Sequence, residues 1–329
     1  MVFILPFFLP AAHMKLQQLR YILEVAKHNL NVSQAAEALF TSQPGISKQI
    51  KLLEEELNVQ IFIRRGKRVV GITEPGHLVL QLAERILKDT HNIKQIGAEF
   101  AQTDAGTLSI ATTHTQARYA LPKIVSQFVK NRPQVQLVIK QGSPKEITEF
   151  LTEGIVDFAI LTENFSPVDH ITTLPCDEWN RSVIVPKGHP LSLLERPLSL
   201  QDLTEYPLIT YDFAFHEGSH IAKAFAQHNI PEPRVALSAV DTDVIKTYVR
   251  LDLGVGLIAS MAYEPEQDDD LVLLSAAHLF EPSTTKIALR NDAYLRGYAY
   301  HFIELFAPSL TKARVEQMLY DPVIDDFSI

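Results

Sequence analysis

The hydrophobic and polar positions of segment 41–57 alternate with a helical period. Ser42 can cap the start of this helix, and Pro44 suits its first turn. Apolar residues then recur at steps of four, three and four, which at about 100° per residue keeps them on one buried stripe. The opposite face carries no carboxylate before Glu55. The predicted stripe is Ile46, Ile50, Leu53 and Leu57, and the predicted polar face is Pro44, Ser47, Lys48 and Lys51.

Two shorter amphipathic helices are expected upstream. The first runs from about residue 16 to 27, and the second follows Ser33, a candidate N-cap, and ends at a break over 40–42. Small residues in the second helix let two helices cross closely, so the three helices together predict a helix-turn-helix. Three ordinary helices of a larger core remain the alternative.

A basic hairpin is predicted after the third helix. Segments 59–63 and 69–73 read as two short strands, and four cations lie in the five residues between them. Cations on such a wing can neutralise DNA phosphates and release counterions. A solvated loop is the alternative. The four cations are Arg64, Arg65, Lys67 and Arg68.

A long helix is predicted from Pro75 to about residue 100. Its apolar residues recur at steps of three, four, seven and three, and the stripe lapses at Asp89 and Thr90. Such a helix cannot bury its seam alone, so pairing with a second copy is expected, which would give two recognition helices for two DNA half-sites. Packing onto the rest of its own chain is the alternative. The predicted seam is Val79, Leu82, Ile86, Ile93 and Ile96.

From residue 106 short apolar strands alternate with helices, which predicts an α/β fold. The chain is expected to cross into a second α/β lobe around 172–175 and to return near Phe280, and two lobes joined by two crossings leave a cleft. First-lobe strands are predicted at 107–111, 134–141, 157–161 and 286–289 with helices at 121–130, 145–152 and 293–306, and second-lobe strands at 181–186, 207–211, 235–239 and 256–258.

Composition changes this picture in two places. The single cysteine, Cys176, excludes an internal disulfide framework and is interpreted as a packed structural thiol. A net charge of −9 does not favour DNA binding, but the charge is unevenly divided along the chain. Residues 14–105 hold 12 Lys or Arg against 10 Asp or Glu, whereas the remaining residues hold 18 against 29, so the surplus acid lies outside the DNA-reading part.

The first thirteen residues are apolar and uncharged. A membrane-spanning helix needs about 20 apolar residues, and this run is shorter and interrupted by Pro6 and Pro10. A signal peptide would have a basic start and a small-residue cleavage site. Residues 1–13 are therefore interpreted as a disordered upstream start or added leader, with no membrane partner.

The N-terminal part resembles the winged helix-turn-helix and linker helix of the LysR-type transcriptional regulators. The resemblance implies a winged helix-turn-helix over 14–73, a linker and dimerisation helix over 74–102, and an effector-binding domain over 103–329. The motifs that carry it are Ala35-Ala36, Thr41-Ser42-Gln43-Pro44, Ser47, Leu53-Glu54, Ile61-Phe62-Ile63-Arg64 and Thr73-Glu74-Pro75-Gly76.

Longer strings resemble one subgroup, the CysB-type regulators of cysteine biosynthesis and sulfur assimilation. The effector domain of the family is a two-lobed, periplasmic-binding-protein-like (type 2) α/β domain, which implies lobe I at about 106–173 and 281–310 and lobe II at about 174–280. The strings are Met14-Lys-Leu-Gln-Gln-Leu-Arg-Tyr, His28-Asn-Leu-Asn-Val-Ser, Ala111-Thr-Thr-His-Thr-Gln-Ala-Arg-Tyr-Ala-Leu-Pro, Cys176 with Trp179-Asn-Arg-Ser, and Asp243-Val-Ile-Lys-Thr-Tyr-Val-Arg-Leu.

The effector site is expected where strand ends meet helix starts, because ligands of open α/β sheets bind there and free helix N–H groups favour anions. Segment 112–116 meets this condition and offers hydroxyl and amide donors without a lysine, a neutral cradle that suits sulfate. Such Thr and Ser residues can instead be helix caps. The candidates are Thr113, Thr115 and Gln116, with Gly142, Ser143 and Thr162 at the next strand ends; the subgroup resemblance supports Thr113, Thr115, Gln116 and Thr162.

The resemblance also points to Trp179 and to segment 211–218 in the second lobe. Where the subgroup commonly has a small hydroxyl residue, this sequence has His216, whose charge would respond to pH near neutrality. The alternatives are that His216 is an ordinary surface histidine and that Trp179 is an ordinary core aromatic.

Other conspicuous residues carry no predicted chemistry. The turn at Gly254 and Gly256 is interpreted as a close backbone approach, and the acidic run 268–270 as a solvated loop. The histidines lack ligand spacing, so neither a metal nor another cofactor is expected.

The resemblance implies a cytoplasmic activator of sulfur-assimilation genes that binds double-stranded promoter DNA, contacts RNA polymerase and forms a homodimer and then a homotetramer. Its inducer would be N-acetylserine or O-acetylserine, opposed by sulfate or thiosulfate. A sister regulator of sulfonate or sulfate-starvation genes, and an oxyanion-binding module without a regulatory role, are alternatives; no catalytic pair indicates an enzyme. The candidate DNA-binding residues are Ser33, Thr41, Ser42, Gln43, Pro44, Ser47, Lys48, Lys51, Arg64, Arg65, Lys67 and Arg68.

Overall fold

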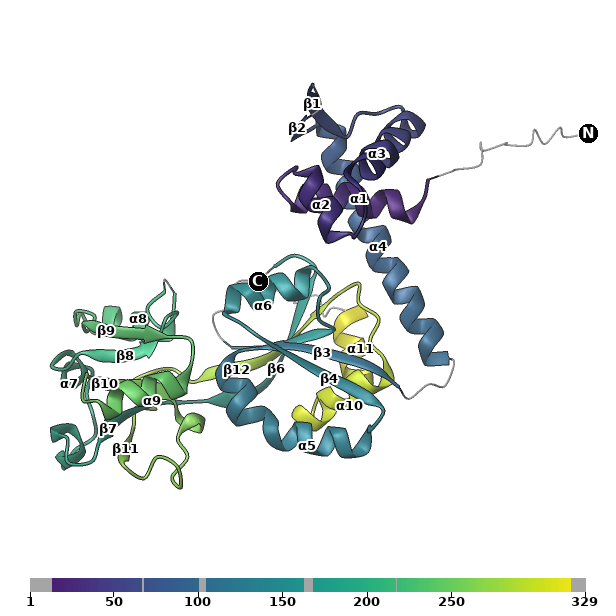
Figure 1. The fold of residues 1–329 in the computed structure, drawn as a ribbon. Helices are drawn as coiled ribbons and strands as arrows, with labels where there is room; N and C mark the ends of the chain where they lie inside the picture. Colours follow the sequence, from purple (N-terminus) through teal and green to yellow (C-terminus); the bar gives the residue numbers. More distant parts are fainter. Residues whose placement is uncertain (1–13, 67, 101–104, 163–167, 217, 321–329) are drawn as a thin grey trace, which may run out of the picture. The chain divides into compact units, whose positions relative to one another are not determined.

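The computed structural model describes residues 14–66, 68–100, 105–162, 168–216 and 218–320 (Figure 1). The chain divides into two compact units, Met1–Gln95 and Ile96–Ile329. The expected leader over 1–13 and the wing residue Lys67 lie outside the described residues. Within the described ranges, no helix combines the length and apolar character that a membrane span requires.

The N-terminal unit is built on three helices, a hairpin and the start of a long helix. The predicted helix-turn-helix is confirmed, with its apolar stripe buried between the helices, although Leu57 at the end of the stripe is only half-buried. The predicted N-cap of the second helix was wrong: the Asn31 side chain accepts from the backbone N–H groups of Ser33 and Gln34, so the helix begins at Val32, two residues earlier than predicted. The elements are α1 (Leu16–Lys27), α2 (Val32–Ala38), α3 (Gln43–Leu57), β1 (Phe62–Arg65), β2 (Arg68–Ile72) and α4 (Glu74–Phe100).

The hairpin is displaced from its predicted position, because a buried carboxylate holds the segment before it. Glu54, 7% exposed, accepts hydrogen bonds from the backbone N–H groups of Ile61 and Phe62 at 2.9 and 3.1 Å. The paired register therefore begins only at Phe62, although the Ile61 carbonyl still accepts from the Thr73 N–H group at 3.0 Å. The first strand starts at Phe62 and includes Arg64 and Arg65, which leaves a shorter tip than the sequence suggested.

The apolar residues of α4 fall on two faces, where the sequence predicted one seam. Val79 and Ile86 pack, with Leu80 and Ala83, against the helix-turn-helix core of the same chain. At about 100° per residue, Leu82 and Leu78 lie about 100° and 140° around the helix from Ala83 and therefore point away from this core. The exposed apolar residues of the helix are Leu78, Leu82, Ile93 and Ile96.

The first lobe of the second unit is a five-stranded sheet with helices on both faces (Figure 1). Along β3, Leu108 and Ile110 pack beneath α5 and α10, whereas Ala111 packs against α6 on the other face. The strand order is β4-β3-β5-β12-β6, with β12 antiparallel to both neighbours. The elements are β3 (Gly106–Thr112), α5 (Leu121–Asn131), β4 (Val135–Gln141), α6 (Pro144–Thr152), β5 (Phe158–Leu161), β6 (Ile171–Trp179), β12 (Ser283–Arg290), α10 (Gly297–Phe306) and α11 (Lys312–Tyr320).

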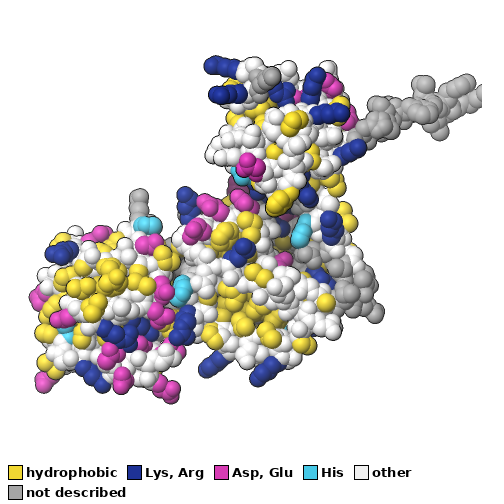
Figure 2. Space-filling view, in the orientation of Figure 1, with side chains coloured by type: hydrophobic (Ala, Val, Ile, Leu, Met, Phe, Trp, Pro, Cys, Tyr) yellow, Lys and Arg dark blue, Asp and Glu magenta, His cyan; other side chains and the backbone are white. Residues whose placement is uncertain are grey.

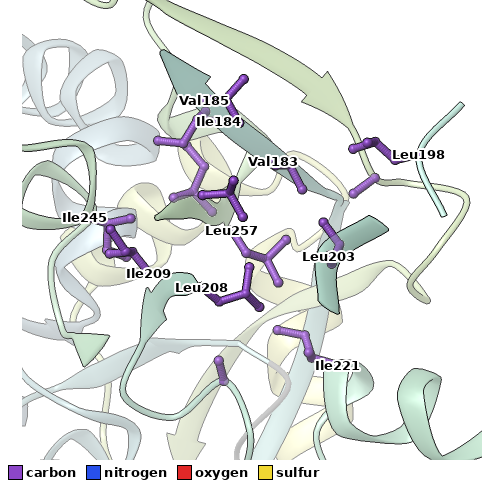
Figure 3. Close-up of a cluster of buried hydrophobic side chains, with 14 of the residues drawn as sticks. Val183, Ile184, Val185, Leu198, Leu203, Leu208, Ile209, Ile221, Ile245 and Leu257 are labelled. Carbon is purple, nitrogen blue, oxygen red and sulfur yellow. The ribbon is translucent and has the colours of Figure 1, made fainter. Parts of the chain in front are cut away.

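The second lobe is another five-stranded sheet, of order β11-β7-β10-β8-β9, around a continuous aliphatic core (Figure 3). Gly254 lies where a Cβ atom would come within 2.3 Å of the Pro207 carbonyl oxygen, which confirms the predicted close approach. The elements are β7 (Arg181–Pro186), a 3-10 turn (Pro190–Leu193), α7 (Leu200–Thr204), β8 (Leu208–Tyr211), α8 (His220–Gln227), β9 (Val235–Ala239), α9 (Thr242–Arg250), β10 (Val255–Ala259), a 3-10 turn (Ser260–Ala262) and β11 (Leu271–Ser275).

Both crossings between the lobes are made by one antiparallel pair of strands, β6 and β12 (Figure 1). In this pair Ile171 lies opposite Arg290 at one end, and Trp179 lies opposite Ser283 at the other. The sequence indicated a crossing here but no nine-residue strand, because the segment is polar and contains Pro175. An edge strand tolerates a proline, since one of its sides needs no ladder hydrogen bond. The strand β11 and the helix α11 were likewise absent from the prediction.

Candidate functional site

The polar face of α3 is presented as the sequence predicted. Pro44, Lys48 and Lys51 are exposed, and Ser47 is half-buried and lies 3.0 Å from the Gln43 amide nitrogen, which donates to its hydroxyl. Lys51 forms one exposed ion pair with Glu55, at 3.4 Å, which solvent weakens. The other candidates at this end, Thr41, Ser42 and Gln43, are exposed, and the Ser42 hydroxyl caps the helix by accepting from the Gly45 N–H group.

The wing cations have two different environments. Arg64 donates from Nη1 to the buried Glu54 carboxylate at 2.8 Å, so this ion pair links the hairpin to α3. Arg65 and Arg68 are exposed on either side of the tip. Figure 2 shows Lys and Arg side chains prevailing on this end of the N-terminal unit. Arg65 and Arg68 are therefore better placed than Arg64 to meet a phosphate.

A hollow beside the start of α2 brings three candidates from separate segments together. Ser33 lies on α2, Gln43 begins α3, and Arg68 begins β2, and all three line this hollow with Asn31. Hydroxyl, amide and guanidinium donors on one surface suit a phosphate oxygen.

The effector domain contains an inter-lobe cavity at the carboxyl ends of strands from both sheets. β3 and β5 end there in lobe I, and the parallel strands β8 and β10 end there in lobe II. Its free volume is about 20 Å³, enough for about one water molecule. It is lined by Thr113, Thr115, Gln116, Thr162, Trp179, Arg181, Tyr211, Phe213, Ala214, Ser219, Ile221 and Ala259.

Lobe I contributes buried hydroxyl and amide groups from the turn after β3. Thr113 accepts from the Gln116 N–H group at 3.4 Å, and the Gln116 amide donates to the Thr285 hydroxyl at 3.3 Å. The following turn, Gln116–Ala120, is π-helical. Pro122 has no N–H group to complete an α-helical bond there, and this widens the turn at the cavity wall.

Lobe II meets this turn through two hydroxyl groups. Thr115 lies 3.1 Å from the Thr242 hydroxyl and donates to Tyr211 at 3.5 Å, and Tyr211 and Thr242 are 2.8 Å apart. The Ala259 N–H group also donates to Tyr211, at 3.2 Å. Thr115 therefore links the two lobes as well as lining the cavity.

Arg181 is a lining residue that the sequence analysis missed. It is the first residue of β7 and pairs with Ala259, the last residue of the antiparallel strand β10, so it reaches the edge where β10 ends. Burial lowers the pKa of this guanidinium to about 10, which keeps it charged at neutral pH. The signal in the sequence is an arginine at the first position of the otherwise largely apolar strand 181–186.

Three predicted ligand residues lie outside the inter-lobe cavity. β4 is the edge strand beyond β3, so Gly142 and Ser143 at its end are one strand further from the cavity than Thr113. Ser143 caps α6 through a reciprocal pair of hydrogen bonds with Glu146, whose pKa these bonds lower. His216 is exposed and shares a neighbouring hollow with Ser143.

Ionisable side chains of the two lobes also meet beside the cavity. Arg118 on the π-helical turn lies 3.7 Å from Asp243 and 3.5 Å from Glu264 in lobe II, and His114 lies 3.1 Å from Asp241. Tyr119 donates to Asp243; burial and this hydrogen bond raise the pKa of Tyr119.

The acidic run is not the solvated loop that the sequence suggested. Asp268 is 2% exposed and lies 2.6 Å from the buried Lys246 ammonium, while Asp269 is exposed. Among the described residues, no group of His, Cys, Asp and Glu side chains is arranged to hold a metal ion. Cys176 is half-buried, and burial raises the pKa of its thiol to about 11, consistent with a structural role.

Both units match models of one family. Residues 16–77 match the bacterial regulatory helix-turn-helix protein, lysR family, and residues 101–311 match the LysR substrate binding domain. The chain belongs to the LysR family of transcriptional regulators. It is therefore a DNA-binding regulator with a domain for a small-molecule effector, and not an enzyme.

Relatives align along almost the whole chain. The HTH-type transcriptional regulator SsuR of Burkholderia cenocepacia is 50% identical over 310 residues, covering 94% of this chain and 100% of the relative. CysB of the same organism is 47% identical, covering 93% of this chain and 97% of that protein. The crystal structure of the cofactor-binding domain of the Cbl transcriptional regulator is 37% identical, with a TM-score of 0.62 over 66% of this chain and 94% of that one.

Proposed function

We propose that this LysR-type regulator activates cysteine-biosynthesis and sulfate-assimilation genes in the cytoplasm, under the control of a small sulfur-related effector in the inter-lobe cavity. The observation that carries the proposal is the cavity itself: Thr113, Thr115, Gln116, Thr162 and Trp179, selected by resemblance to CysB-type regulators, come together on its wall. N-acetylserine or O-acetylserine would act as inducer, and sulfate or thiosulfate as competitor.

A sister role in sulfonate or sulfate-starvation control is the second candidate, favoured by the similarity to SsuR and Cbl. Calorimetric titration of the protein with sulfate, thiosulfate, O-acetylserine and N-acetylserine distinguishes the two. Binding of an acetylserine supports the cysteine regulator, whereas binding of none of the four favours the sister role.

Dimerisation through α4 is part of the proposal. Leu78, Leu82, Ile93 and Ile96 leave an apolar surface on the outer side of this helix, and Ile93 is 68% exposed. A second copy of α4 would cover this surface and set two recognition helices on a two-fold axis. Assembly into a tetramer and contact with RNA polymerase follow from the family resemblance.

Effector control is proposed to act through the lobe contacts. A ligand shifts the protein only by its different affinity for two arrangements of the lobes. Binding in so small a cavity requires Thr115 and its partners across the cleft, Tyr211 and Thr242, to move. The linker helices would pass this change to the spacing of the DNA-binding units.

Lys51→Ala is expected to weaken promoter binding and to lower the salt dependence of the binding constant by about 0.9 in the log–log slope, the loss of one phosphate contact. Fluorescence anisotropy with a promoter fragment over a range of salt concentrations measures both. Lys312→Ala is the matched control, because Lys312 is an exposed helical lysine paired with Glu316 four residues on, as Lys51 is with Glu55. An unchanged slope in Lys51→Ala would remove this lysine from the interface.

Thr115→Ala is expected to weaken the response to N-acetylserine roughly 5- to 30-fold, because one or two hydrogen bonds of about 1 kcal/mol each are lost. Promoter binding without inducer should stay near that of the wild type. Gel shifts across an inducer titration measure the change, and Thr152→Ala on α6, an exposed threonine of the same lobe, is the control. A full response in Thr115→Ala would show that the effector lies elsewhere.

A further inference from the structure

One five-residue turn carries both a part of the cavity wall and a contact between the lobes. The π-helical turn Gln116–Ala120 begins with Gln116, which lines the inter-lobe cavity, and contains Tyr119, which is not among the lining residues. Single π-helical turns are rare and often occur at functional sites. A shift of this turn would alter the cavity wall and the lobe contact together.

Tyr119 belongs to lobe I by its position in the chain, but its side chain packs against lobe II. The half-buried ring contacts the hydrophobic core of lobe II. The hydroxyl group donates to the Asp243 carboxylate and accepts from the Lys246 ammonium group, at 3.2 Å from the Lys246 nitrogen. Both hydrogen-bond partners lie on α9, so this one side chain ties the turn to a helix of the opposite lobe.

The contact made by Tyr119 is better shielded from water than the ion pairs of the same turn. Lys246 is 2% exposed and is held by Asp268 at 2.6 Å, so its ammonium group has a fixed position beside the Tyr119 hydroxyl. Arg118, by contrast, has a side chain that is 43% exposed, and its ion pair with Asp243 spans 3.7 Å. Solvent weakens an exposed ion pair, whereas hydrogen bonds to charged groups are strong where water is excluded.

The arrangement that Tyr119 stabilises has little room for an acetylated amino acid. The free volume of the cavity is about 20 Å³, enough for about one water molecule. Sites for small organic ligands usually have about 300 Å³ or more. A ligand of this kind therefore needs the lobes or the turn to move apart. A contact that must break on binding lowers the apparent affinity, because the protein gives up its free energy when the ligand enters.

We propose that Tyr119 is a positioning residue that holds the lobes in the arrangement with the small cavity, and so sets the effector concentration to which the regulator responds. This inference rests on the proposed effector role of the cavity and assigns its control to a residue outside the cavity wall. When the Tyr119 hydroxyl leaves Asp243 and Lys246, the π-helical turn can shift and carry Gln116 with it, which makes room for a ligand.

Tyr119→Phe in the full-length protein keeps the ring and removes both hydrogen bonds. The dissociation constant for N-acetylserine, measured by calorimetry, should fall about fivefold, the effect of losing about one net hydrogen bond from the arrangement with the small cavity. A purely structural defect would weaken binding or leave it unchanged. Tyr298→Phe is the matched control, because Tyr298 donates to the Thr107 carbonyl at 3.0 Å within lobe I, and it should leave the dissociation constant unchanged.

Trp179 provides a second measurement that needs no effector. It is the only tryptophan of the chain, is half-buried and lines the cavity, so its fluorescence reports on access to this wall. The Stern–Volmer constant for quenching by acrylamide should rise in Tyr119→Phe and stay at the wild-type value in Tyr298→Phe, because only the first substitution favours lobe opening. Unchanged quenching in a folded Tyr119→Phe protein would overturn the proposal.

Asp243→Asn tests the same contact from lobe II if Tyr119→Phe does not fold. The amide has the size of the carboxylate but is a weaker acceptor for the Tyr119 hydroxyl, so N-acetylserine should bind about twofold more tightly. Weaker or unchanged binding in Asp243→Asn, with unchanged quenching of Trp179, would contradict the role of this contact.

The two measurements separate this inference from the proposed function. If N-acetylserine binds the wild type and Tyr119→Phe with the same affinity, the proposed effector role stands and the role of Tyr119 is wrong. If N-acetylserine binds neither protein, the proposed inducer is wrong. The quenching of Trp179 then decides the role of Tyr119 by itself, since a rise supports the role and an unchanged value overturns it.

Discussion

Asp268→Asn is expected to destabilise the effector domain by about 3–5 kcal/mol, the cost of removing one partner from a buried ion pair. Asp268 accepts from Lys246 at 2.6 Å, from Arg250 at 2.8 Å and from the Glu264 N–H group at 2.9 Å. Lys246 is 2% exposed, so an asparagine would leave its ammonium group buried with only the more distant Asp243 carboxylate, at 4.0 Å, as an anionic partner. Urea unfolding of the full-length protein measures the change in the free energy of unfolding.

Asp269→Asn is the matched control, because the neighbouring carboxylate is exposed. It should change the free energy of unfolding by less than about 0.5 kcal/mol. Equal effects of the two substitutions would mean that Asp268 is solvated, as the sequence pattern alone suggested.

The lowered pKa of Asp268 predicts that the free energy of unfolding depends on pH. Burial raises the pKa of Asp268, but hydrogen bonds from Lys246, Glu264 and Arg250 outweigh this effect and hold it below its usual value. A lowered pKa in the folded state stabilises the protein above the unfolded pKa of about 3.9 and ceases to do so as the pH falls through the folded value. The difference in stability between the wild type and Asp268→Asn should therefore be constant above about pH 5 and narrow below about pH 4, as urea unfolding at several pH values can test.

Gly76→Ala is expected to destabilise the N-terminal unit by about 3 kcal/mol, the upper part of the usual range for overpacking. A Cβ atom at this position would lie 2.2 Å from the Ile61 carbonyl oxygen and 2.9 Å from the Thr73 hydroxyl. The first contact is with backbone, which cannot rotate away. Thr73 also accepts from the Gly76 N–H group at 2.9 Å, so α4 starts against the hairpin at this glycine.

Promoter binding should fall at least tenfold in Gly76→Ala, because the wing and α3 share the core that the start of α4 completes. Thermal unfolding followed by circular dichroism and fluorescence anisotropy with promoter DNA measure the two effects. Gly97→Ala in the same helix has no heavy atom within 4 Å of the added Cβ and should be neutral or stabilising. A Gly76→Ala protein with wild-type melting and DNA binding would contradict the predicted clash.

The two units present their chemistry in different ways. In the N-terminal unit the candidate contacts lie on one exposed helix face and a hairpin tip, so single substitutions there should alter DNA affinity without unfolding the protein. In the effector domain the lining residues Thr115 and Tyr211 also hold the lobes together. Substitutions at the cavity are therefore expected to change lobe closure and ligand affinity together.

The sequence by itself determined the elements that depend on local periodicity. The helices around Ile22 and Ile50 and the strand 181–186 lie where their patterns placed them, because the burial of a helix stripe or a strand depends on residues a few positions apart. The alternation of strands and helices along the chain also predicted the two lobes and the two crossings between them. Thr113, Thr115, Gln116 and Thr162 could be selected because strand ends and family motifs are both visible in one dimension.

Only the tertiary structure decided which side chains are partners across long separations. Asp268 differs from Asp269 through its contact with Lys246, and Arg181 reaches the cavity through its pairing with Ala259. The polar strand β6 exists because β12, more than a hundred residues later, supplies its hydrogen bonds. Pairing between side chains or strands that are far apart in sequence depends on the tertiary fold, and the chain pattern does not encode it at any fixed spacing.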